Sequence, residues 1–329
     1  MLEINEANVK AWSELGAGGS FGQAMMDVAE SFPQALVICA DLTDATRVRE
    51  FSKRFPERFV QVGIAEQNAI GIAAGLALAG KMPFVTTFAC FASMRCCEQV
   101  RTDLAYPNLN VKLVGSYAGV AFGTLGTTHY ALEDVGILRS IANMVVICPA
   151  DGLETVKATW AAAQYPGPVY LRLTGGRNLP IVFPQDYSFV IGKAITLREG
   201  ADAAILATGS MVARALAAAD ALTGEGIAVR VLDVHTLKPM DAEAVRRAAQ
   251  ETALLVTVEE HSIMGGLGSA VAEVLAEMGG APRLVRMGLP DRFVRIANYA
   301  TILNRCGLNE QSIAQTVKSN LGVAPHSPS

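Results

Sequence analysis

Short apolar runs alternate with alanine-rich stretches of helical period along most of the chain. Strands are expected in the first half at residues 35–40, 84–88, 111–115, 144–148 and 169–173, where the runs are rich in β-branched and aromatic residues. Helices are expected to begin between them, near Ala65, Ser93, Ala131 and Leu153. Strands that alternate with helices are typical of a parallel sheet with crossover helices. The first half therefore predicts a doubly wound α/β domain.

A second set of elements follows the segment GGRNLPIVFPQDY (175–187), whose two Gly and two Pro and lack of helical period indicate a linker. The expected strands are 203–207, 228–232, 253–258 and 283–286, and the expected helices are 211–222, 242–249 and 267–278. The short apolar strands suit sheets covered on both faces. We predict two doubly wound α/β domains, residues 1–180 and a smaller one of residues 181–329, ending in a loose tail, VAPHSPS.

Composition narrows the class of protein. With 329 residues, 51% hydrophobic and 18% charged, the chain can bury two cores. A net charge of −4 without basic runs argues against binding to nucleic acid or an anionic membrane. The longest apolar stretch, Ala69–Gly80, has 12 residues, whereas a membrane span needs about 20, so we expect a buried helix there. The N-terminus has no apolar signal region, which predicts a cytoplasmic protein.

Six cysteines have no metal-ligand spacing, and no metal site is expected in this chain. Cys39 and Cys148 lie in apolar strand-like runs, where a thiol behaves as a small hydrophobe. The adjacent Cys96 and Cys97 lack the C-x-x-C spacing of redox pairs, and the sequence assigns them no role.

The segment VGIAEQNAIGIAAGLA (62–77) holds one carboxylate, Glu66, at an expected strand-to-helix junction among small and apolar residues. A carboxyl group in such surroundings tends to hold or share a proton near neutral pH. Gly71 and Gly75 would let another backbone approach closely. The alternative is that Glu66 only stabilises the helix N-terminus through the dipole. Spacing alone does not separate the two.

GIAEQNAIGIAAGLA resembles the pyrimidine-domain motif of transketolases and 1-deoxyxylulose-5-phosphate synthases. Six further segments are similar to the family in the same order: ADLTDAT (40–46), TTFACF (86–91), THYALEDVGILR (128–139), ICPAD (147–151), LDVHTLKP (232–239) and VEEHSIMGGLGSAVAEVLAE (258–277). The resemblance covers nearly the whole chain, but only the second half of a full-length transketolase. It implies a pyrimidine-binding domain followed by a transketolase C-terminal domain.

The resemblance implies a role for each matching residue. Glu66 would bind N1′ of the aminopyrimidine of thiamine diphosphate, where a shared proton favours the tautomer that activates the cofactor. Phe91 would pack on the pyrimidine ring, and Phe88 is either a second contact or a core aromatic. Asp41 would hold the cofactor region, its alternative being a helix N-cap. His129 would contact substrate hydroxyls.

The loop before this histidine departs from the family, which has H-x-G-x-x-x-G-E-D-G where this chain has YAGVAFGTLG (117–126). Tyr117 replaces a substrate-binding histidine, and Thr124 and Leu125 replace an acidic pair. Losing a carboxylate that would bind a sugar hydroxyl implies a substrate without that hydroxyl, such as a branched or deoxy ketose. Tyr117 and Leu125 are therefore expected at the substrate.

Phosphate recognition also departs from the family. Ser20 and Ala45 stand where transketolases carry an arginine and a serine near the mouth of the site. Arg172 and Arg177 flank the loop where the family places a further phosphate arginine. Either can bind an anion bidentately, and the alternative is a solvated surface arginine.

The sequence contains no G-D-G stretch, through which the family holds the diphosphate and its divalent cation. The resemblance therefore implies a split enzyme, in which an N-terminal-half partner subunit holds Mg²⁺ and the diphosphate, in an α2β2 assembly. The implied reaction is transfer of a two-carbon ketol unit from a ketose. Alternatives within the cofactor class are a deoxyxylulose-phosphate-synthase-like subunit and a 2-oxoacid dehydrogenase β-type subunit.

Two interpretations outside this class are disfavoured. GGSFG (18–22) fits the G-x-S-x-G of hydrolases but follows a polar helical segment, not an apolar strand. A non-catalytic scaffold is argued against by the joint presence of Glu66, Phe91 and His129. Glu259, Glu260 and His261 match the family's C-terminal domain, and we assign them no chemistry.

Overall fold

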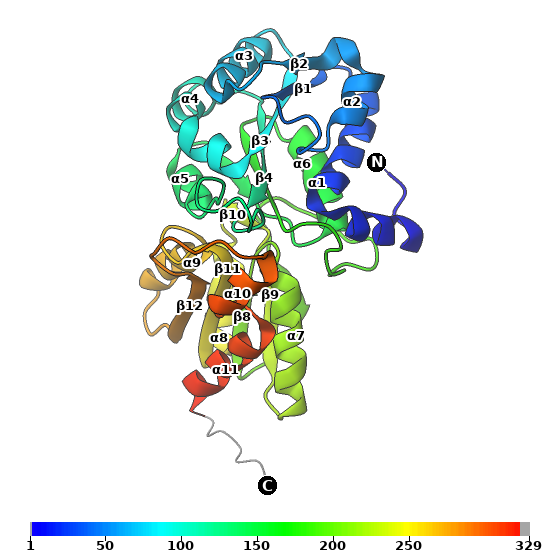
Figure 1. Cartoon of the computed structure of the whole chain (residues 1–329). Coiled ribbons are helices and arrows are strands. Elements are labelled where there is room, and N and C mark those ends of the chain that lie inside the picture. Colours follow the sequence, from blue (N-terminus) through cyan, green and yellow to red (C-terminus); the bar gives the residue numbers. More distant parts are fainter. Residues whose placement is uncertain (1, 323–329) are drawn as a thin grey trace.

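The computed structural model describes residues 2–322, and the expected tail VAPHSPS (323–329) lies outside them. The chain forms two α/β units, one above the other in Figure 1, each with a central sheet between layers of helices. The prediction of two α/β domains built on parallel sheets is confirmed, and each sheet also has one antiparallel edge strand that was not expected.

The first sheet has seven strands in the order β10-β5-β6-β4-β3-β1-β2. Its strands are β1 (Ala35–Cys39), β2 (Phe59–Gln61), β3 (Met82–Phe88), β4 (Lys112–Ala118), β5 (Val145–Ile147), β6 (Val169–Thr174) and β10 (Thr236–Lys238). All residues of β1, β3 and β6 are buried, which explains why their sequences are runs without polar alternation. The five strands expected here from the sequence are present.

Helices cover both faces of this sheet. On one side lie α3 (Glu66–Leu78), α4 (Cys97–Gln99) and α5 (Asp134–Ser140), and on the other α1 (Glu6–Ser31), α2 (Arg49–Arg54) and α6 (Gly152–Gln164), as Figure 1 shows. A short 3₁₀ turn, η1 (Pro56–Arg58), precedes β2, and two π-helical segments, η2 (Phe91–Arg95) and η3 (Val100–Ala105), flank α4. The helix expected to begin near Ser93 is therefore π-helical, a conformation that is frequent at functional sites.

The second sheet has the order β12-β11-β8-β9-β7. Its strands are β7 (Ile195–Arg198), β8 (Ala203–Ala207), β9 (Val229–Asp233), β11 (Leu254–Ser262) and β12 (Arg283–Leu289). The helices are α7 (Met211–Gly224), α8 (Ala242–Glu251), α9 (Leu267–Ala276), α10 (Tyr299–Arg305) and α11 (Glu310–Leu321). The expected strands and helices of this half are present, and β7, β10, α10 and α11 are additions.

The two units are joined by more than a linker, because β10 belongs to the first sheet. Thr236 of β10 pairs antiparallel with Ile147 of β5. Residues 236–238 fall in the second predicted domain, so the larger sheet is completed by residues from beyond the expected boundary. This pairing fixes the second unit close to the edge of the first.

Helix α1 is interrupted at Gly16, where the backbone takes φ 74°. A Cβ atom at this position would lie 1.9 Å from the carbonyl oxygen of Gly176, so only glycine lets the helix approach that loop. The segment GGSFG lies inside this helix, and Ser20 is buried with Oγ donating to the carbonyl of Trp12 at 3.0 Å. The strand-to-helix elbow of a hydrolase is not formed there.

Helix α3 differs from the buried helix expected for residues 69–80. Its inner face is buried, but Gly71 and Gly75 face outward, and Leu78 is 76% exposed. A Cβ atom built on either glycine meets no atom within 4 Å. A continuous outer strip of the helix is therefore small or apolar and uncovered by this chain.

Within residues 2–322 no helix is long and apolar enough to cross a membrane. All six cysteines are free thiols. Burial raises the pKa of Cys96 to about 12 and that of Cys90 to about 11, so both remain protonated near neutral pH.

Candidate active site

Most of the residues singled out from the sequence lie where the strands of the first sheet end. They follow the carboxyl ends of neighbouring parallel strands: Asp41 after β1, Glu66 after β2, Phe91 after β3, Tyr117 at the end of β4 and Arg177 after β6. Ligands of open α/β sheets bind outside the carboxyl ends of the strands.

Glu66 is the first residue of α3, and its carboxylate turns inward. It is 4% exposed, and Arg95 Nη1 donates to its Oε1 at 2.7 Å. The guanidinium carbon of Arg95 lies 4.0 Å from the centroid of the Phe91 ring. Arg95 thus links the buried carboxylate of Glu66 to the ring of Phe91, and Glu66 also stands in the first turn of α3, where a carboxylate favours the helix dipole.

An aromatic cluster adjoins this group, and we use that term for Phe88, Phe91, Tyr117, Phe122 and His129. The rings of Phe91 and His129 are 5.6 Å apart between centroids, and those of Phe88 and His129 are 6.0 Å apart. Tyr117 stacks on Phe122 at 4.0 Å. The structure therefore brings Phe88, Phe91, Tyr117 and His129 together, while Phe122, which no sequence motif singled out, completes the cluster.

The loop that carries Phe122 and His129 is held from the second unit. The carboxylate of Glu260, at 1% exposure, accepts from the backbone N–H of Val120 at 2.8 Å and from the hydroxyl of Tyr299 at 2.5 Å. Burial raises the pKa of Glu260, an effect opposed by the hydrogen bonds from Ser210 and Tyr299. Glu260, which was assigned no chemistry from the sequence, thus positions the loop of the aromatic cluster.

His129 is partly buried and oriented by its neighbour. Thr128 Oγ1 lies 2.9 Å from Nδ1 of the imidazole, so Nε2 is the ring nitrogen that this contact leaves free for a hydrogen bond to another group. Leu125 lies in the same loop and is 44% exposed. Leu125 is not a member of the aromatic cluster, so its expected contact with substrate stays a prediction.

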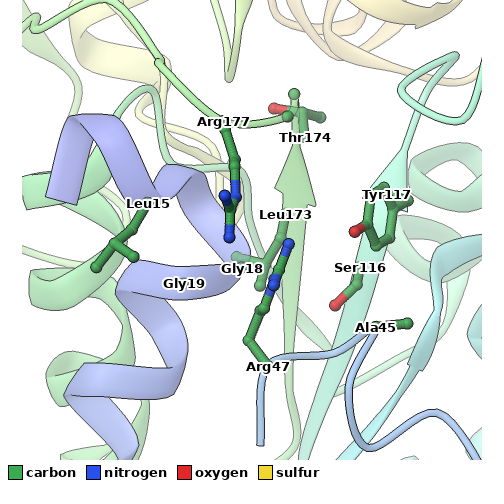
Figure 2. A pocket seen from close by; sticks show the side chains of 12 residues that line it. Leu15, Gly18, Gly19, Ala45, Arg47, Ser116, Tyr117, Leu173, Thr174 and Arg177 are labelled. Carbon is green, nitrogen blue, oxygen red and sulfur yellow. The ribbon is translucent and has the colours of Figure 1, made fainter.

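A pocket opens beside Tyr117, and Figure 2 shows Arg47 and Arg177 extending into it from opposite rims. Its wall is formed by Gly18 and Gly19 of α1, by Ala45 and by the end of β6. Within residues 2–322 neither guanidinium has a carboxylate at ion-pair distance. Two like charges that are not engaged in ion pairs make this pocket suited to an anion. Arg177 was expected from the sequence, and Arg47 was not.

Backbone strain is concentrated at this pocket. Arg47 and Tyr117 have φ of 62° and 54°, in the left-handed region, where side chains other than Asn and Asp are uncommon. Every other non-glycine residue of the described chain with positive φ is Asn or Asp. Gly22 admits the turn at Arg47, because a Cβ atom there would lie 2.4 Å from the Arg47 carbonyl oxygen. Such strained residues cluster at functional sites.

Arg172 corrects one expectation, because its side chain points into the protein. It is 1% exposed, and its guanidinium binds the carboxylate of Asp134 at 2.8 Å and 3.1 Å and the carbonyl of Glu260 at 2.9 Å. Burial raises the pKa of Asp134, but the charge of Arg172, the nearby His261 and the hydrogen bonds from Arg172 and Tyr170 together outweigh burial, so the net pKa is lowered. Arg172 neutralises a buried carboxylate and is not presented to a substrate.

Asp41 is exposed and has φ 57°, and no helix begins beside it, which rules out the helix N-cap. Its backbone N–H donates to Gln61 Oε1 at 2.7 Å, and the same amide oxygen accepts from Gly63 N–H at 3.2 Å. Gln61 thus ties the loop of Asp41 to the loop that leads into Glu66.

No group of three or more His, Cys, Asp or Glu within residues 2–322 is arranged to hold a metal ion.

The buried histidine His261 is kept from the charged form, because burial lowers its pKa to about 4. Its Nε2 accepts from the backbone N–H of Gly136 in α5 at 3.3 Å. His261 therefore serves the contact between the two units.

Comparison with known proteins identifies both units. The family profile "Transketolase, pyrimidine binding domain" matches residues 14–178, and "Transketolase, C-terminal domain" matches residues 192–313. The finer division at residues 180 and 181 stays a prediction.

Curated relatives include two subunits of similar length. An apulose-4-phosphate transketolase subunit of Phocaeicola vulgatus is 42% identical over 90% of this chain and 95% of its own. The "6-deoxy-6-sulfo-D-fructose transketolase subunit SqwH" of Clostridium sp. is 44% identical over 88% and 90%. The "1-deoxy-D-xylulose-5-phosphate synthase" of Syntrophotalea carbinolica is 40% identical over 96% of this chain but only 50% of its own.

A solved structure, "Split gene transketolase, inactive beta4 tetramer", has a TM-score of 0.85 and 41% identity and covers 94% of this chain and 99% of its own. The likeness extends over both units and their connection.

Proposed function

The chain belongs to the transketolase family, and from that premise we propose that it is the pyrimidine-binding subunit of a split transketolase, which transfers a two-carbon ketol unit only when a partner subunit completes the cofactor site. The observation that carries the proposal is Glu66, a carboxylate buried at the sheet edge beside the ring of Phe91.

The residues present fit the pyrimidine end of thiamine diphosphate. Thiamine diphosphate supplies a thiazolium carbon that stabilises the carbanion of the ketol fragment. In this chain Glu66 offers a carboxylate that already accepts a hydrogen bond from a flat, nitrogen-bearing cation, and Phe91 offers a ring on which that cation stacks. We infer that Glu66 holds the proton at N1′, with Phe91 and Phe88 against the ring and Asp41 bordering the site.

The diphosphate and its Mg²⁺ are assigned to the partner subunit. The described part of this chain has no cluster of metal ligands, and the sequence has no G-D-G stretch. Support also comes from the related split-gene structure, an inactive β4 tetramer. We propose that two copies of each subunit assemble as α2β2.

The outer strip of α3 marks where the partner would lie. Gly71, Gly75 and Leu78 leave it apolar, small and open, and the helix begins at Glu66 itself. A partner that packs on this strip would contact the outward face of α3, the helix whose first residue is Glu66. Small residues at such a contact permit close backbone approach.

On the substrate side we propose roles for His129 and Tyr117, whose rings both pack against Phe88 in the aromatic cluster. His129 is proposed to bind the ketose hydroxyls next to the reacting carbons. Tyr117 belongs both to the aromatic cluster and to the pocket wall, so it connects the two regions. Arg47 and Arg177 are proposed to bind the anionic end of the sugar, which supports a phosphorylated or sulfonated ketose.

A donor screen on the assembled pair tests the proposed reaction. With thiamine diphosphate and Mg²⁺, a ketose phosphate and an aldose phosphate acceptor should give an acceptor longer by two carbons and a donor shorter by two, without release of carbon dioxide. Each subunit alone is the control and should be inactive. Decarboxylation of pyruvate without ketol transfer would contradict the proposal and favour the 1-deoxyxylulose-5-phosphate-synthase-like or 2-oxoacid dehydrogenase alternatives.

A further inference from the structure

Arg95 lies beside the proposed cofactor site. No sequence motif singled it out, and the proposed reaction gives it no role. It extends from the π-helical segment η2, four residues after Phe91. Its Nη1 donates to Glu66 Oε1 at 2.7 Å, and its guanidinium carbon lies 4.0 Å from the Phe91 ring centroid. One side chain therefore contacts both groups that the proposed function gives to the aminopyrimidine.

The guanidinium has the two features of an aminopyrimidine that these groups would recognise. It is flat, so that it stacks on an aromatic face, and it presents N–H donors at its edge to a carboxylate. We propose that Arg95 holds the place of the aminopyrimidine in the chain without cofactor and has to leave Glu66 for the cofactor to bind. This inference rests on the proposed function.

Occupancy gives the reason why the contact must be released. The guanidinium of Arg95 is hydrogen-bonded to Glu66 Oε1 and lies over the Phe91 ring, where the proposed function places the aminopyrimidine. Arg95 therefore has to move before that ring can stack on Phe91 and contact Glu66.

The Arg95 side chain can move away from Glu66 because it borders solvent. Its side chain is 45% exposed, while its partner Glu66 is enclosed. Met94, its neighbour on η2, is 46% exposed, so this side of the site opens to solvent in the chain alone. Rotation of the long side chain into water would leave Glu66 and Phe91 in place.

Such a contact lowers apparent cofactor affinity, because only the fraction of chains with Arg95 released can bind. Removing the guanidinium should therefore tighten binding of thiamine diphosphate to the assembled pair. Arg95→Met keeps an unbranched stem while removing the charge and the donors. We expect a dissociation constant about tenfold lower than wild type.

Calorimetric titration of the assembled pair with thiamine diphosphate at fixed Mg²⁺ measures this directly. Arg101→Met, an exposed arginine on the neighbouring segment η3, is the matched control and should bind as wild type does. Unchanged or weaker binding by Arg95→Met would overturn the inference, weaker binding meaning that Arg95 is a lasting part of the site. If the wild-type pair bound no cofactor, the proposed function itself would fail.

Discussion

Replacing Glu66 by Gln is expected to lower kcat for ketol transfer by about 10²–10⁴-fold, the usual contribution of a positioned proton-transfer group. Gln has the size of Glu and can accept a hydrogen bond, but it cannot take up a proton. Because Glu66 is buried and its hydrogen bond comes from the half-exposed Arg95, the isosteric amide should leave the fold and assembly intact.

The measurement is kcat of the assembled pair at saturating cofactor, with the thermal transition followed in parallel. Glu98→Gln is the control, since Glu98 is an exposed carboxylate on α4. It should retain full activity. A Glu66→Gln enzyme within about threefold of wild type would remove the carboxylate from the mechanism.

Removing either Arg47 or Arg177 is expected to weaken use of an anionic ketose. A hydrogen bond to a charged group contributes about 1.5–3 kcal/mol, so Arg47→Met and Arg177→Met should each lower kcat/KM by about 10–100-fold, mainly through KM. The neutral ketose without its phosphate or sulfonate should be used equally by the variants and wild type, because no charge is there to bind.

The control for the Arg47 and Arg177 variants is Arg54→Met. Arg54 is an exposed arginine of α2 that forms an ion pair with Glu30 outside the pocket. Equal losses on charged and neutral donors would mean that the arginines shape the site without binding an anion. Unchanged KM for the charged donor would place the sugar's anionic end elsewhere.

The sequence predicted those strands whose burial requires a run of apolar residues, and it missed strands without such a run. Strands such as β1 and β3 are buried over their whole length, so their apolar runs stand out. β2 and β10 are as short as β5, but they include the polar residues Gln61 and Lys238 and lack the fully buried apolar run that reveals β5. The crossing of β10 into the first sheet depends on pairing with β5, a contact that no local pattern contains.

Helix α1 shows how tertiary contacts override local preference. Gly16, Gly18 and Gly19 disfavour a helix, and the segment was not expected as one long helix. It forms because one face is buried against α6, with Trp12 and Phe21 almost fully enclosed. The break at Gly16 then turns Gly18 and Gly19 into the wall of the pocket.

Motifs in the sequence identified those residues of the candidate site that stand within a recognisable stretch of chain. Glu66, Phe91 and His129 each stand in a recognisable stretch, and the structure brings them to one edge of the sheet. Arg95 reaches Glu66 on another segment, and Arg47 reaches a pocket wall built from several segments, so neither carries a local signal beyond its charge. Phe122 lies in the same loop as Tyr117 and His129, but no motif distinguishes it.

Arg172 was misassigned although a sequence signal existed. It stands inside the apolar run VYLRL, and an arginine within a fully buried strand requires a buried carboxylate partner. That partner is Asp134, in the segment THYALEDVGILR. Arg177, which lies beyond the strand that ends at Thr174, has no such constraint and reaches the pocket instead.

We propose that the cofactor is held jointly by this chain and a different subunit. The test is to titrate thiamine diphosphate with Mg²⁺ into this chain, into the N-terminal-half subunit and into their mixture. We expect tight binding only in the mixture, with one cofactor per pair of unlike subunits. Tight binding by this chain alone, or no binding by the mixture, would show that the site is not shared.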